Sequence, residues 1–478
     1  MVKSFRCKKP LKFLERAEID AIHNQTLRIL RDIGVFIEDD EILALLADFG
    51  CIVDMKKKLT KFSSDLLEAA LKSCSDNFTL KSGDGRNDLS FDRDTVRFGP
   101  CSGMQVMDIK TGQLRPGTVA DAEKTLRLTD ALDIMAGANA GLGFISDCPP
   151  QINLVCYYAL CLRNSSKVFC LGAMDESVKW GIEMAQLAGR DVLIPASSSF
   201  PLSWHREQVD AVKSACRAGL PVVLQSMASP GTTAPVTLAG AAVLMNAEIL
   251  SMIVVSQLLR PGTGIMYSCF NIPMDMRFGT MASGSMELGM LTVVSAQLSK
   301  FYGVNSMIFG PNTDSKMYDP QSGYEKALQW QLEAMAGINL IWGAGMIENH
   351  TIWSDAQLMV DVEICEMVGR YLEGIRVDEE TMSMELFRQV GHFPGNFLTH
   401  PHTLKHCREE LFIPSLANRE SREAWMDKGA PSLMEKAEKR VENVLRQHEP
   451  ANLLPEVERE LEKIIGAAAA EKGIDVIF

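Results

Sequence analysis

Between about residues 95 and 347 the chain alternates short β-rich runs with longer helical segments. Several helical segments end in a glycine just before the next run, as a left-handed helix C-cap requires. Strands that alternate with helices pair in parallel through right-handed crossovers. The sequence therefore predicts about eight strand–helix units. The β-rich runs are 95–99, 133–141, 167–173, 192–200, 221–229, 264–270, 306–312 and 339–347.

About eight such units predict a closed (β/α)₈ TIM barrel over residues 95–375. A doubly wound open sheet is the alternative, but the chain lacks the GxGxxG fingerprint that would support it. The flanking segments, 1–94 and 376–478, are predicted to be helical extensions. In the first, 17–35, 39–50 and 63–74 combine apolar residues at helical spacing with capping residues.

Composition limits the class of protein. Of the 478 residues 46% are hydrophobic and 23% are charged, which is typical of a globular enzyme. The formal net charge of −13 argues against nucleic acid or an anionic membrane as main partner. The first residues lack the apolar core of a signal peptide, so we expect a cytoplasmic protein. The apolar run 239–259 contains Asn246 and Glu248, which favours a buried helix over a membrane span.

The 12 cysteines show no CxxC or CxxH spacing, so we interpret them mainly as buried thiols. His400, His402 and His406, with Cys407 beside them, have spacing that suggests a metal site. Pro401 interrupts the start of this segment, and it lies outside the barrel pattern. Capping and packing are the favoured roles, and we expect no metal bound directly to this chain.

The stretch 339–355 is the strongest candidate for a functional site. It runs as an apolar strand past glycines into Glu348, Asn349, His350 and Trp353. In a barrel, the active site lies where the strands reach their C-terminal ends. An acid, an amide, an imidazole and an indole there predict a pocket for a small ligand that carries both charges.

Four more residues follow other predicted strands: Gln225, Tyr267, Asn312 and, in a loop, Trp204. The aromatic members could form a cage for a cation. Packing in the core is the alternative for each aromatic residue, and a buried acceptor of backbone hydrogen bonds is the alternative for Glu348. The chain shows no Ser-His-Asp order, P-loop or HExxH motif.

Three segments resemble a known family: NTDSKMYDPQSGYEKALQWQLEAMAGINLIWGAGMIEN, DVEICEMVGRYLEGI with VDEET, and FLTHPHTLKHCREELFIPSL. They are similar to the trimethylamine methyltransferase family of corrinoid-protein methyltransferases, over nearly the whole chain. Founding members carry pyrrolysine at the barrel mouth, and this sequence has none. The chain therefore resembles the non-pyrrolysine branch, whose characterised members demethylate quaternary amines.

This resemblance implies methyl transfer from a quaternary amine, glycine betaine first, to Co(I) of a corrinoid protein, giving dimethylglycine. Proline betaine, carnitine and γ-butyrobetaine stay open as substrates. The implied cofactor is a corrinoid (cobalamin) carried by the partner protein. A quaternary ammonium already has a neutral amine as leaving group, so no acid or base is needed. His350 and Asn349 would then bind the betaine carboxylate, and Glu348 would orient His350 or hold the loop.

Two other classes of protein remain alternatives. The first is a non-catalytic barrel that binds betaine or docks the corrinoid protein. The second is a metal-dependent methyltransferase that uses the cluster from His400 to Cys407. The charged helical tail is predicted to cap the barrel, with a homo-oligomer contact as the alternative.

Overall fold

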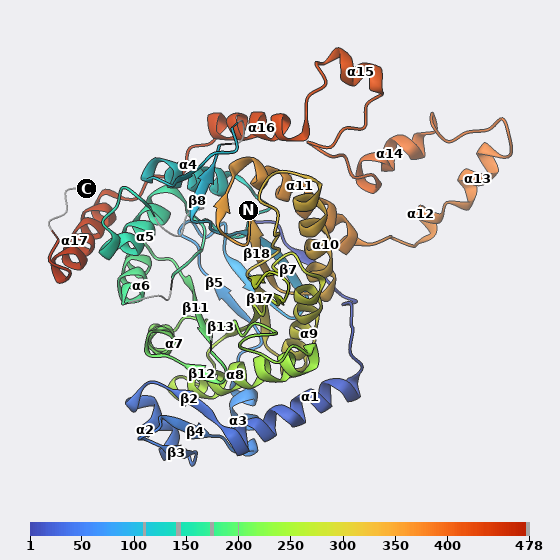
Figure 1. The fold of residues 1–478 in the computed structure, drawn as a ribbon. Coiled ribbons are helices and arrows are strands. Elements are labelled where there is room, and N and C mark those ends of the chain that lie inside the picture. Colours follow the sequence, from blue (N-terminus) through green and yellow to red (C-terminus); the bar gives the residue numbers. More distant parts are fainter. Residues whose placement is uncertain (109–110, 140–144, 173–175, 199, 475–478) are drawn as a thin grey trace.

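A computed structural model describes residues 1–108, 111–139, 145–172, 176–198 and 200–474. Its main sheet lies at the centre of the molecule, with helices around it (Figure 1). Seven strands follow one another in parallel in the order β10-β11-β13-β14-β17-β18-β7, and β1 (Phe5–Arg6) adds antiparallel to β7. The seven strands are β7 (Thr95–Pro100), β10 (Phe169–Cys170), β11 (Val192–Ser198), β13 (Val222–Ser226), β14 (Ile265–Cys269), β17 (Asn305–Ile308) and β18 (Leu340–Ala344).

The second predicted strand forms two isolated parallel bridges instead of a regular ladder. Met135 bridges to Phe98 in β7, and Gly137 bridges to Val168, just before β10. The Ala136 N–H donates to the Phe98 carbonyl at 2.6 Å. This segment therefore links the β7 and β10 sides of the sheet. Residues 140, 141, 173 and 199 of the predicted runs lie outside the described residues.

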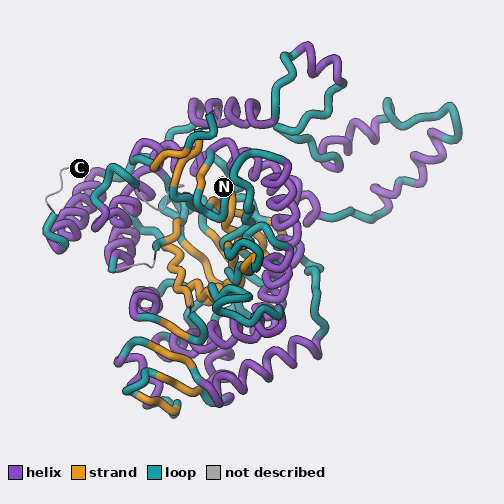
Figure 2. Tube along the Cα trace, viewed as in Figure 1, coloured by secondary structure: helices purple, strands orange, loops and turns teal. Residues whose placement is uncertain are grey.

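The helices between the strands confirm the predicted alternation, and helices surround the strands in Figure 2. Gly219, Gly303 and Gly337 each adopt the left-handed C-cap conformation that the sequence predicts. The helices are α4 (Val119–Ala131), α5 (Asn153–Asn164), α6 (Ser177–Leu187), α7 (Arg206–Ala218), α8 (Leu238–Leu259), α9 (Met286–Tyr302), α10 (Pro320–Ala336) and α11 (Asp355–Glu373).

Helix α8 is long and apolar enough to cross a membrane, and within the described chain no other helix is. Most of its side chains are nevertheless buried inside the molecule, against β13, β14, α1 (Arg16–Arg28) and α3 (Ser64–Ser73). This confirms the prediction of a buried core helix.

The strands separate two hydrophobic clusters. Met266, Met307 and Leu340 belong to an inner cluster, whereas their neighbours Ile265 and Ile341 belong to the outer cluster that packs against the helices. The alternation follows from the period of two in a strand. Trp342 fills part of the interior. A Cβ added at Gly99 or Gly137 would lie within 2.3 Å of its indole, which explains both glycines.

The N-terminal segment is only partly helical, which corrects the prediction for residues 1–94. Helices α1, α2 (Asp40–Asp48) and α3 form where predicted, with Asp39 and Ser63 as N-caps. Short strands between them were not predicted, because three residues carry too little pattern to be recognised. β2 (Val35–Ile37), β3 (Ile52–Asp54) and β4 (Leu59–Lys61) form a small antiparallel sheet, which β12 (Ser203–Trp204) extends.

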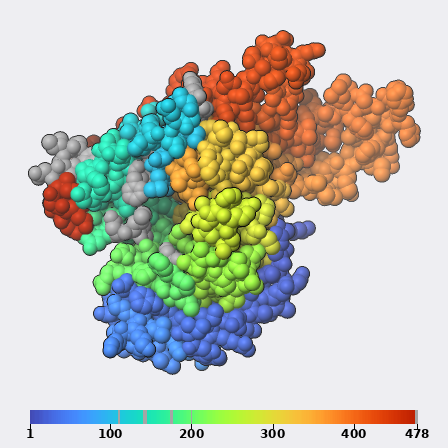
Figure 3. Space-filling view, viewed as in Figure 1, coloured from blue at the N-terminus to red at the C-terminus, as the bar shows by residue number. Residues whose placement is uncertain are grey.

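The C-terminal segment is helical and returns to the body of the molecule. α16 (Leu433–Gln447) packs on α11 and α4, and α17 (Pro455–Glu471) packs on α5 and α6. The helices between α11 and α16 project from the body of the molecule (Figures 1 and 3). They are α12 (Glu379–Met382), α13 (Met384–Val390), α14 (Pro401–Glu410) and α15 (Arg422–Asp427).

Candidate functional site

The C-terminal ends of the parallel strands bring a row of neutral polar side chains together. Ser197 at the end of β11 donates through Oγ to Gln225 Oε1 at 2.9 Å. Gln225 on β13 in turn donates through Nε2 to Ser268 Oγ on β14 at 3.3 Å. Gln225 and Ser268 are buried, and they occupy the inward register shared with Met266. The interior therefore offers amide and hydroxyl groups without charge.

His350 lies at this same end of the strands. Its Nδ1 lies 3.3 Å from the Cys101 Sγ, and its ring meets Phe270 edge-on at 5.1 Å between centroids. Burial, followed by the charge of Lys326, lowers the pKa of His350 to about 3, although the Phe309 backbone opposes this shift. The imidazole is therefore neutral at physiological pH.

The hydrogen-bond partner of His350 sets its tautomer. Burial raises the pKa of the Cys101 thiol to about 12, so the thiol keeps its proton. In the tautomer in which this thiol donates to Nδ1, the imidazole proton resides on Nε2. Nε2 is buried and makes no hydrogen bond to the described residues, although the side chain as a whole is only half-buried. A neutral N–H donor without a protein partner is thus available here.

The loop that carries His350 has an unusual backbone. Glu348, Asn349 and His350 have φ angles of 49°, 51° and 64°, so three successive non-glycine residues are left-handed. Such residues cost free energy and persist only where their surroundings hold them. The Glu348 N–H donates to the Ser315 carbonyl at 3.0 Å, and the Asn349 N–H donates to Thr313 at 2.9 Å. The loop after β18 is therefore fixed to the loop after β17.

Two carboxylates hold that second loop in turn. Glu325 Oε2 accepts from the Thr313 hydroxyl at 2.6 Å and from the Asp314 N–H at 2.9 Å. The Asp314 carboxylate accepts from the Ser283 and Gly284 backbone N–H groups, each at 2.9 Å. The loops after β14, β17 and β18 are consequently joined by hydrogen bonds.

A fully buried ion pair supports the start of the β18 loop. Lys326 Nζ lies 2.7 Å from Asp361 Oδ2 and donates to the carbonyls of Gly343 and Met346. Asp361 also accepts from the Gly345 N–H at 2.7 Å. Burial raises the pKa of Asp361, and Lys326 opposes this change. The pair ties α10 and α11 to the backbone just before Glu348.

The two predicted cage aromatics, Tyr267 and Trp204, and the third predicted aromatic site residue, Trp353, do not gather around His350. Tyr267 points outward from β14, where its hydroxyl donates to Asn246 of α8 at 3.0 Å. Trp204 lies in β12 and donates to the Glu248 carbonyl at 3.3 Å. Trp353 lies in β20 (Ile352–Trp353) and donates to Asp355 at 2.9 Å. All three are buried, as their core-packing alternative requires.

The other predicted residues do lie near the loops after β17 and β18. Asn312 is buried, and its Oδ1 makes no hydrogen bond to the described residues. Asn349 contacts Met281 Sδ at 3.6 Å through Nδ2. Glu348 holds the loop through its main chain, because its carbonyl accepts from the Thr351 N–H and hydroxyl. Cys101, one of the cysteines that the sequence predicts to be a buried thiol, contacts the His350 ring through Sγ.

Cys101 after β7, Phe270 after β14 and Trp342 in the inner cluster were not predicted as site residues. Each follows or lies within a predicted strand, so its position relative to the strand end is the sequence signal that could have identified it. Glu248 on α8 is a further titratable group that was not predicted from the sequence. It is buried, accepts from Ser226 Oγ at 2.6 Å and from the Leu202 N–H at 3.0 Å, and burial raises its pKa to about 7.

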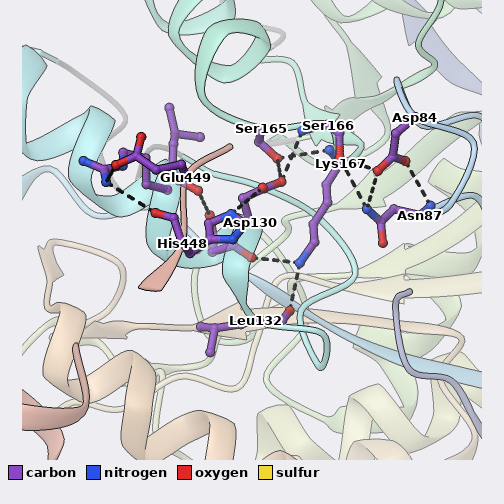
Figure 4. Close-up of polar contacts among 12 residues, drawn as sticks. Asp84, Asn87, Asp130, Leu132, Ser165, Ser166, Lys167, His448 and Glu449 are labelled. Atoms are coloured by element: carbon purple, nitrogen blue, oxygen red, sulfur yellow. Dashed lines mark hydrogen bonds and ion pairs between the residues drawn. The ribbon is translucent and has the colours of Figure 1, made fainter. Parts of the chain in front are cut away.

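A second buried polar network lies at the opposite end of the strands (Figure 4). Lys167 is buried and donates to the carbonyls of Thr129, Leu132 and Met135 at 2.8–3.0 Å. Burial lowers its pKa to about 8. Asp130 nearby accepts from Ser165 Oγ at 2.7 Å and lies 2.8 Å from His448. Because Lys167 caps the end of α4 with its donors engaged, this network is structural.

The histidine cluster of the tail has its own local contacts. The rings of His402 and His406 lie 4.5 Å apart, and His400 caps α14 by accepting from the His402 N–H. Across the described ranges, no group of three or more His, Cys, Asp or Glu side chains has a geometry that could hold a metal ion.

Comparison with known proteins indicates that this chain is a methyltransferase. The family model described as trimethylamine methyltransferase (MTTB) matches residues 2–473. "Trimethylamine methyltransferase MttB" of Desulfitobacterium hafniense strain DCB-2 is 31% identical over 470 residues, covering 96% of this chain and 94% of the relative. "Glycine betaine methyltransferase" of strain Y51 is 29% identical over 472 residues, covering 96% and 98%.

Among solved structures, the Methanosarcina barkeri monomethylamine methyltransferase (MtmB) is similar with 13% identity and a TM-score of 0.46, covering 89% of this chain and 92% of that one. The mixed strand–helix architecture and a neutral site at the strand ends are those of a small-molecule enzyme. The match over nearly the whole chain is more specific: this protein belongs to the trimethylamine methyltransferase (MTTB) family.

Proposed function

We propose that this chain transfers a methyl group from glycine betaine to the Co(I) of a corrinoid protein. The products are dimethylglycine and methyl-Co(III) on the partner. The observation that carries the proposal is the neutral donor pair at the strand ends, His350 Nε2 and Gln225, in a chain that matches a methylamine and betaine methyltransferase family throughout. The corrinoid is a substrate carried by the other protein.

The charge of the site supports a quaternary amine. In methyl transfer the C–N electron pair returns to nitrogen, so the positive charge on nitrogen decreases in the transition state and is gone in the product. A carboxylate beside the ammonium would stabilise the ground state more than the transition state. His350, Gln225 and Ser268 are neutral, and Phe270 offers only the weak attraction of an aromatic ring.

The substrate carboxylate would then need hydrogen-bond donors from the protein. A carboxylate accepts well from neutral N–H groups, and the Nε2–H of His350 is buried and unpaired among the described residues. We infer that Nε2 binds this carboxylate, with Asn349 as a second donor from the same turn. Glu348 holds the turn through its backbone. Gln225 and Asn312 are proposed to line the pocket from β13 and the β17 loop.

We also propose that the strands form a closed (β/α)₈ barrel, with residues 95–375 as catalytic domain. The bridges from Met135 to Phe98 and from Gly137 to Val168 support closure, because they join the strands at the two sides of the sheet. Closure places the eight strand ends around one mouth, which gives the partner a single approach to the substrate.

We propose an apolar rim around this mouth as the surface that receives the corrinoid protein. Exposed apolar side chains follow the C-terminal ends of five strands, and such a patch marks a protein interaction site. Phe278 and Met276 are about three-quarters exposed at the tip of the hairpin formed by β15 (Met274–Asp275) and β16 (Thr280–Met281). The rim consists of Met104, Phe200, Val236, Met276, Phe278, Met281 and Met317.

The decisive experiment is single-turnover methylation of reduced cobalamin or of a reduced corrinoid protein. Glycine betaine, trimethylamine, proline betaine, carnitine and γ-butyrobetaine would each be offered as methyl donor. We expect methylcobalamin to form fastest with glycine betaine. Turnover with trimethylamine alone would overturn the substrate assignment. Betaine binding without methylation of either acceptor would identify a binding protein, and dependence on added zinc would favour the metal alternative.

A further inference from the structure

The indole of Trp342 lies on the inner face of the sheet, next to the candidate site. Trp342 on β18 pairs with Gly99 on β7, the neighbouring strand in Figure 1. Cys101 follows Gly99 by two residues and contacts the His350 ring through Sγ at 3.3 Å. Cys101 and Trp342 belong to the same inner cluster. The indole therefore lies just below the side chains at the strand ends.

Solvent exposure changes at the level of the indole. Met266, Met307 and Trp342 are 0% exposed, whereas Cys101 and Cys170 of the same inner cluster keep 4% and 8%. Cys170 is the last residue of β10, so both thiols lie at the strand ends. Open space therefore reaches the two thiols and stops at the indole, which is the largest side chain among the described members of the inner cluster.

Packing alone positions the Trp342 ring. A Cβ added at Gly99 would lie 2.3 Å from Trp342 Cε3, and one added at Gly137 would lie 2.1 Å from Cη2. The Trp342 Nε1 is buried and makes no hydrogen bond to the described residues. The position of the ring thus depends on the side chains that Gly99 and Gly137 lack, and it can be changed at either glycine.

We propose that Trp342 is the floor of the substrate pocket and limits the length of the methyl donor. This inference rests on the proposed function, because it concerns the same zwitterion at the same strand ends. With the carboxylate bound by His350 Nε2, the chain between carboxylate and ammonium occupies the space above the indole. γ-Butyrobetaine has two more methylene groups in that chain than glycine betaine. A floor that cannot move excludes them, and one methylene in a pocket changes discrimination by roughly 10–200-fold.

The test is the ratio of kcat/KM for γ-butyrobetaine to kcat/KM for glycine betaine, with free cob(I)alamin as methyl acceptor. Trp342→Leu opens the floor, so we expect this ratio to rise at least about tenfold. Trp330→Leu is the matched control. Trp330 is equally buried, but it lies on α10 in the outer cluster and meets Phe98 edge-on at 5.3 Å between centroids. Its loss removes an indole on the helix side of the sheet and should leave the ratio unchanged.

Gly99→Ala tests the same floor without removing the tryptophan. The three atoms nearest to the added methyl group all belong to Trp342, so the indole must move. The interior beneath it is closed by Met266 and Met307, which leaves the strand ends as the direction of movement. The pocket then becomes shallower, and the ratio should fall below that of the wild type. In the Trp342→Leu background the same change at Gly99 should have little effect, because the indole that it displaces is absent.

Circular dichroism and thermal melting identify the variants that fold, and calorimetry gives the ratio of the two affinities independently of turnover. If Trp342→Leu does not fold, Trp342→Phe and Gly99→Ala carry the test, because they should shift the ratio in opposite directions.

Two results separate this inference from the proposed function. A wild type that demethylates glycine betaine, while Trp342→Leu changes the ratio no more than Trp330→Leu does, overturns the floor alone. A wild type that binds γ-butyrobetaine more tightly than glycine betaine also overturns it. A wild type that neither binds nor demethylates either zwitterion overturns the proposed function itself.

Discussion

At the scale of single residues, the site depends on a histidine whose two nitrogens are differently engaged. Cys101 Sγ lies 3.3 Å from Nδ1, and Nε2 makes no hydrogen bond to the described residues. Because burial holds His350 neutral, it offers a donor without introducing positive charge. A charged lysine in place of His350 would bind a carboxylate less selectively, because an ammonium group attracts any anion at longer range.

His350→Ala is therefore expected to weaken glycine betaine binding by roughly ten- to hundredfold, since a hydrogen bond to a charged group contributes about 1.5–3 kcal/mol. Isothermal titration calorimetry measures this directly. Cys101→Ser is the control, because its hydroxyl still donates to Nδ1 and should keep the affinity near that of the wild type. Equal affinities for wild type and His350→Ala would remove His350 from the site.

Glu248 provides a pH-dependent contribution to stability. Its pKa rises from 4.5 to about 7 on folding because of burial, so the folded state binds its proton more tightly. The wild type should thus lose stability as pH rises from about 4.5 to 7. Glu248→Gln lacks this titration, so we expect it to gain up to about 3 kcal/mol over the wild type at pH 8, and nothing at pH 4.5.

Denaturant unfolding at several pH values checks the Glu248 prediction. The exposed Glu462→Gln on α17 serves as control and should follow the wild-type pH profile. Parallel profiles for the wild type and Glu248→Gln would show that Glu248 is already ionised in the folded protein.

At the scale of elements, the site rests on three loops that are bonded to one another. The left-handed residues 348–350 are held by the β17 loop, which Glu325 and Asp314 fix to the β14 loop. Beneath them the Lys326–Asp361 pair connects two helices to the β18 strand end. Binding residues on such a scaffold stay positioned before the ligand arrives.

Lys326→Met should lower the free energy of unfolding by about 3–5 kcal/mol, because it leaves Asp361 buried and uncompensated. Lys326→Met combined with Asp361→Asn should recover at least half of that loss, since the double variant buries no charge. Chemical denaturation gives both values. Lys463→Met at the exposed Lys463–Glu460 pair is the control, with an expected change of about 0.5 kcal/mol or less. A double variant less stable than the single one would contradict this account.

The sequence was sufficient for the order of strands and helices but not for every side-chain direction. All eight β-rich runs lie where strands or bridges form, since period and glycine caps are local signals. Tyr267 was misplaced because whether a strand residue points inward depends on register, and one position changes the face. Trp204 lies in a short strand whose pairing partner, Ile37, is distant in sequence, and the short strand of Trp353 pairs both with nearby Met346 and with distant Val106. The Cys101–His350 contact joins residues 249 positions apart, which no local pattern predicts.

At the scale of the whole molecule, the proposed docking surface surrounds the candidate site. The apolar rim follows the strand ends, so a protein that binds the rim would face the side chains at those ends.

Phe278→Asp tests the rim. We expect methyl transfer to a corrinoid protein to fall at least about tenfold in kcat/KM, because an apolar anchor at the centre of an interface contributes strongly to binding. Transfer to free cob(I)alamin should be unchanged, since the small cofactor needs no protein docking surface. Phe49→Asp is the control for both acceptors. An equal loss with both acceptors would show that Phe278 supports the pocket and not the docking surface.

The pairing of β7 with β18 has a consequence for how the chain is made. During synthesis β7, the first parallel strand, is complete long before β18, the last one, which ends at Ala344. At a synthesis rate of about 5–20 residues per second, one edge of β7 stays without this partner for on the order of 10–50 seconds. An unpaired edge is open to other nascent chains for that time. The yield of active protein should therefore be sensitive to translation speed and to chaperones that shield strands during synthesis.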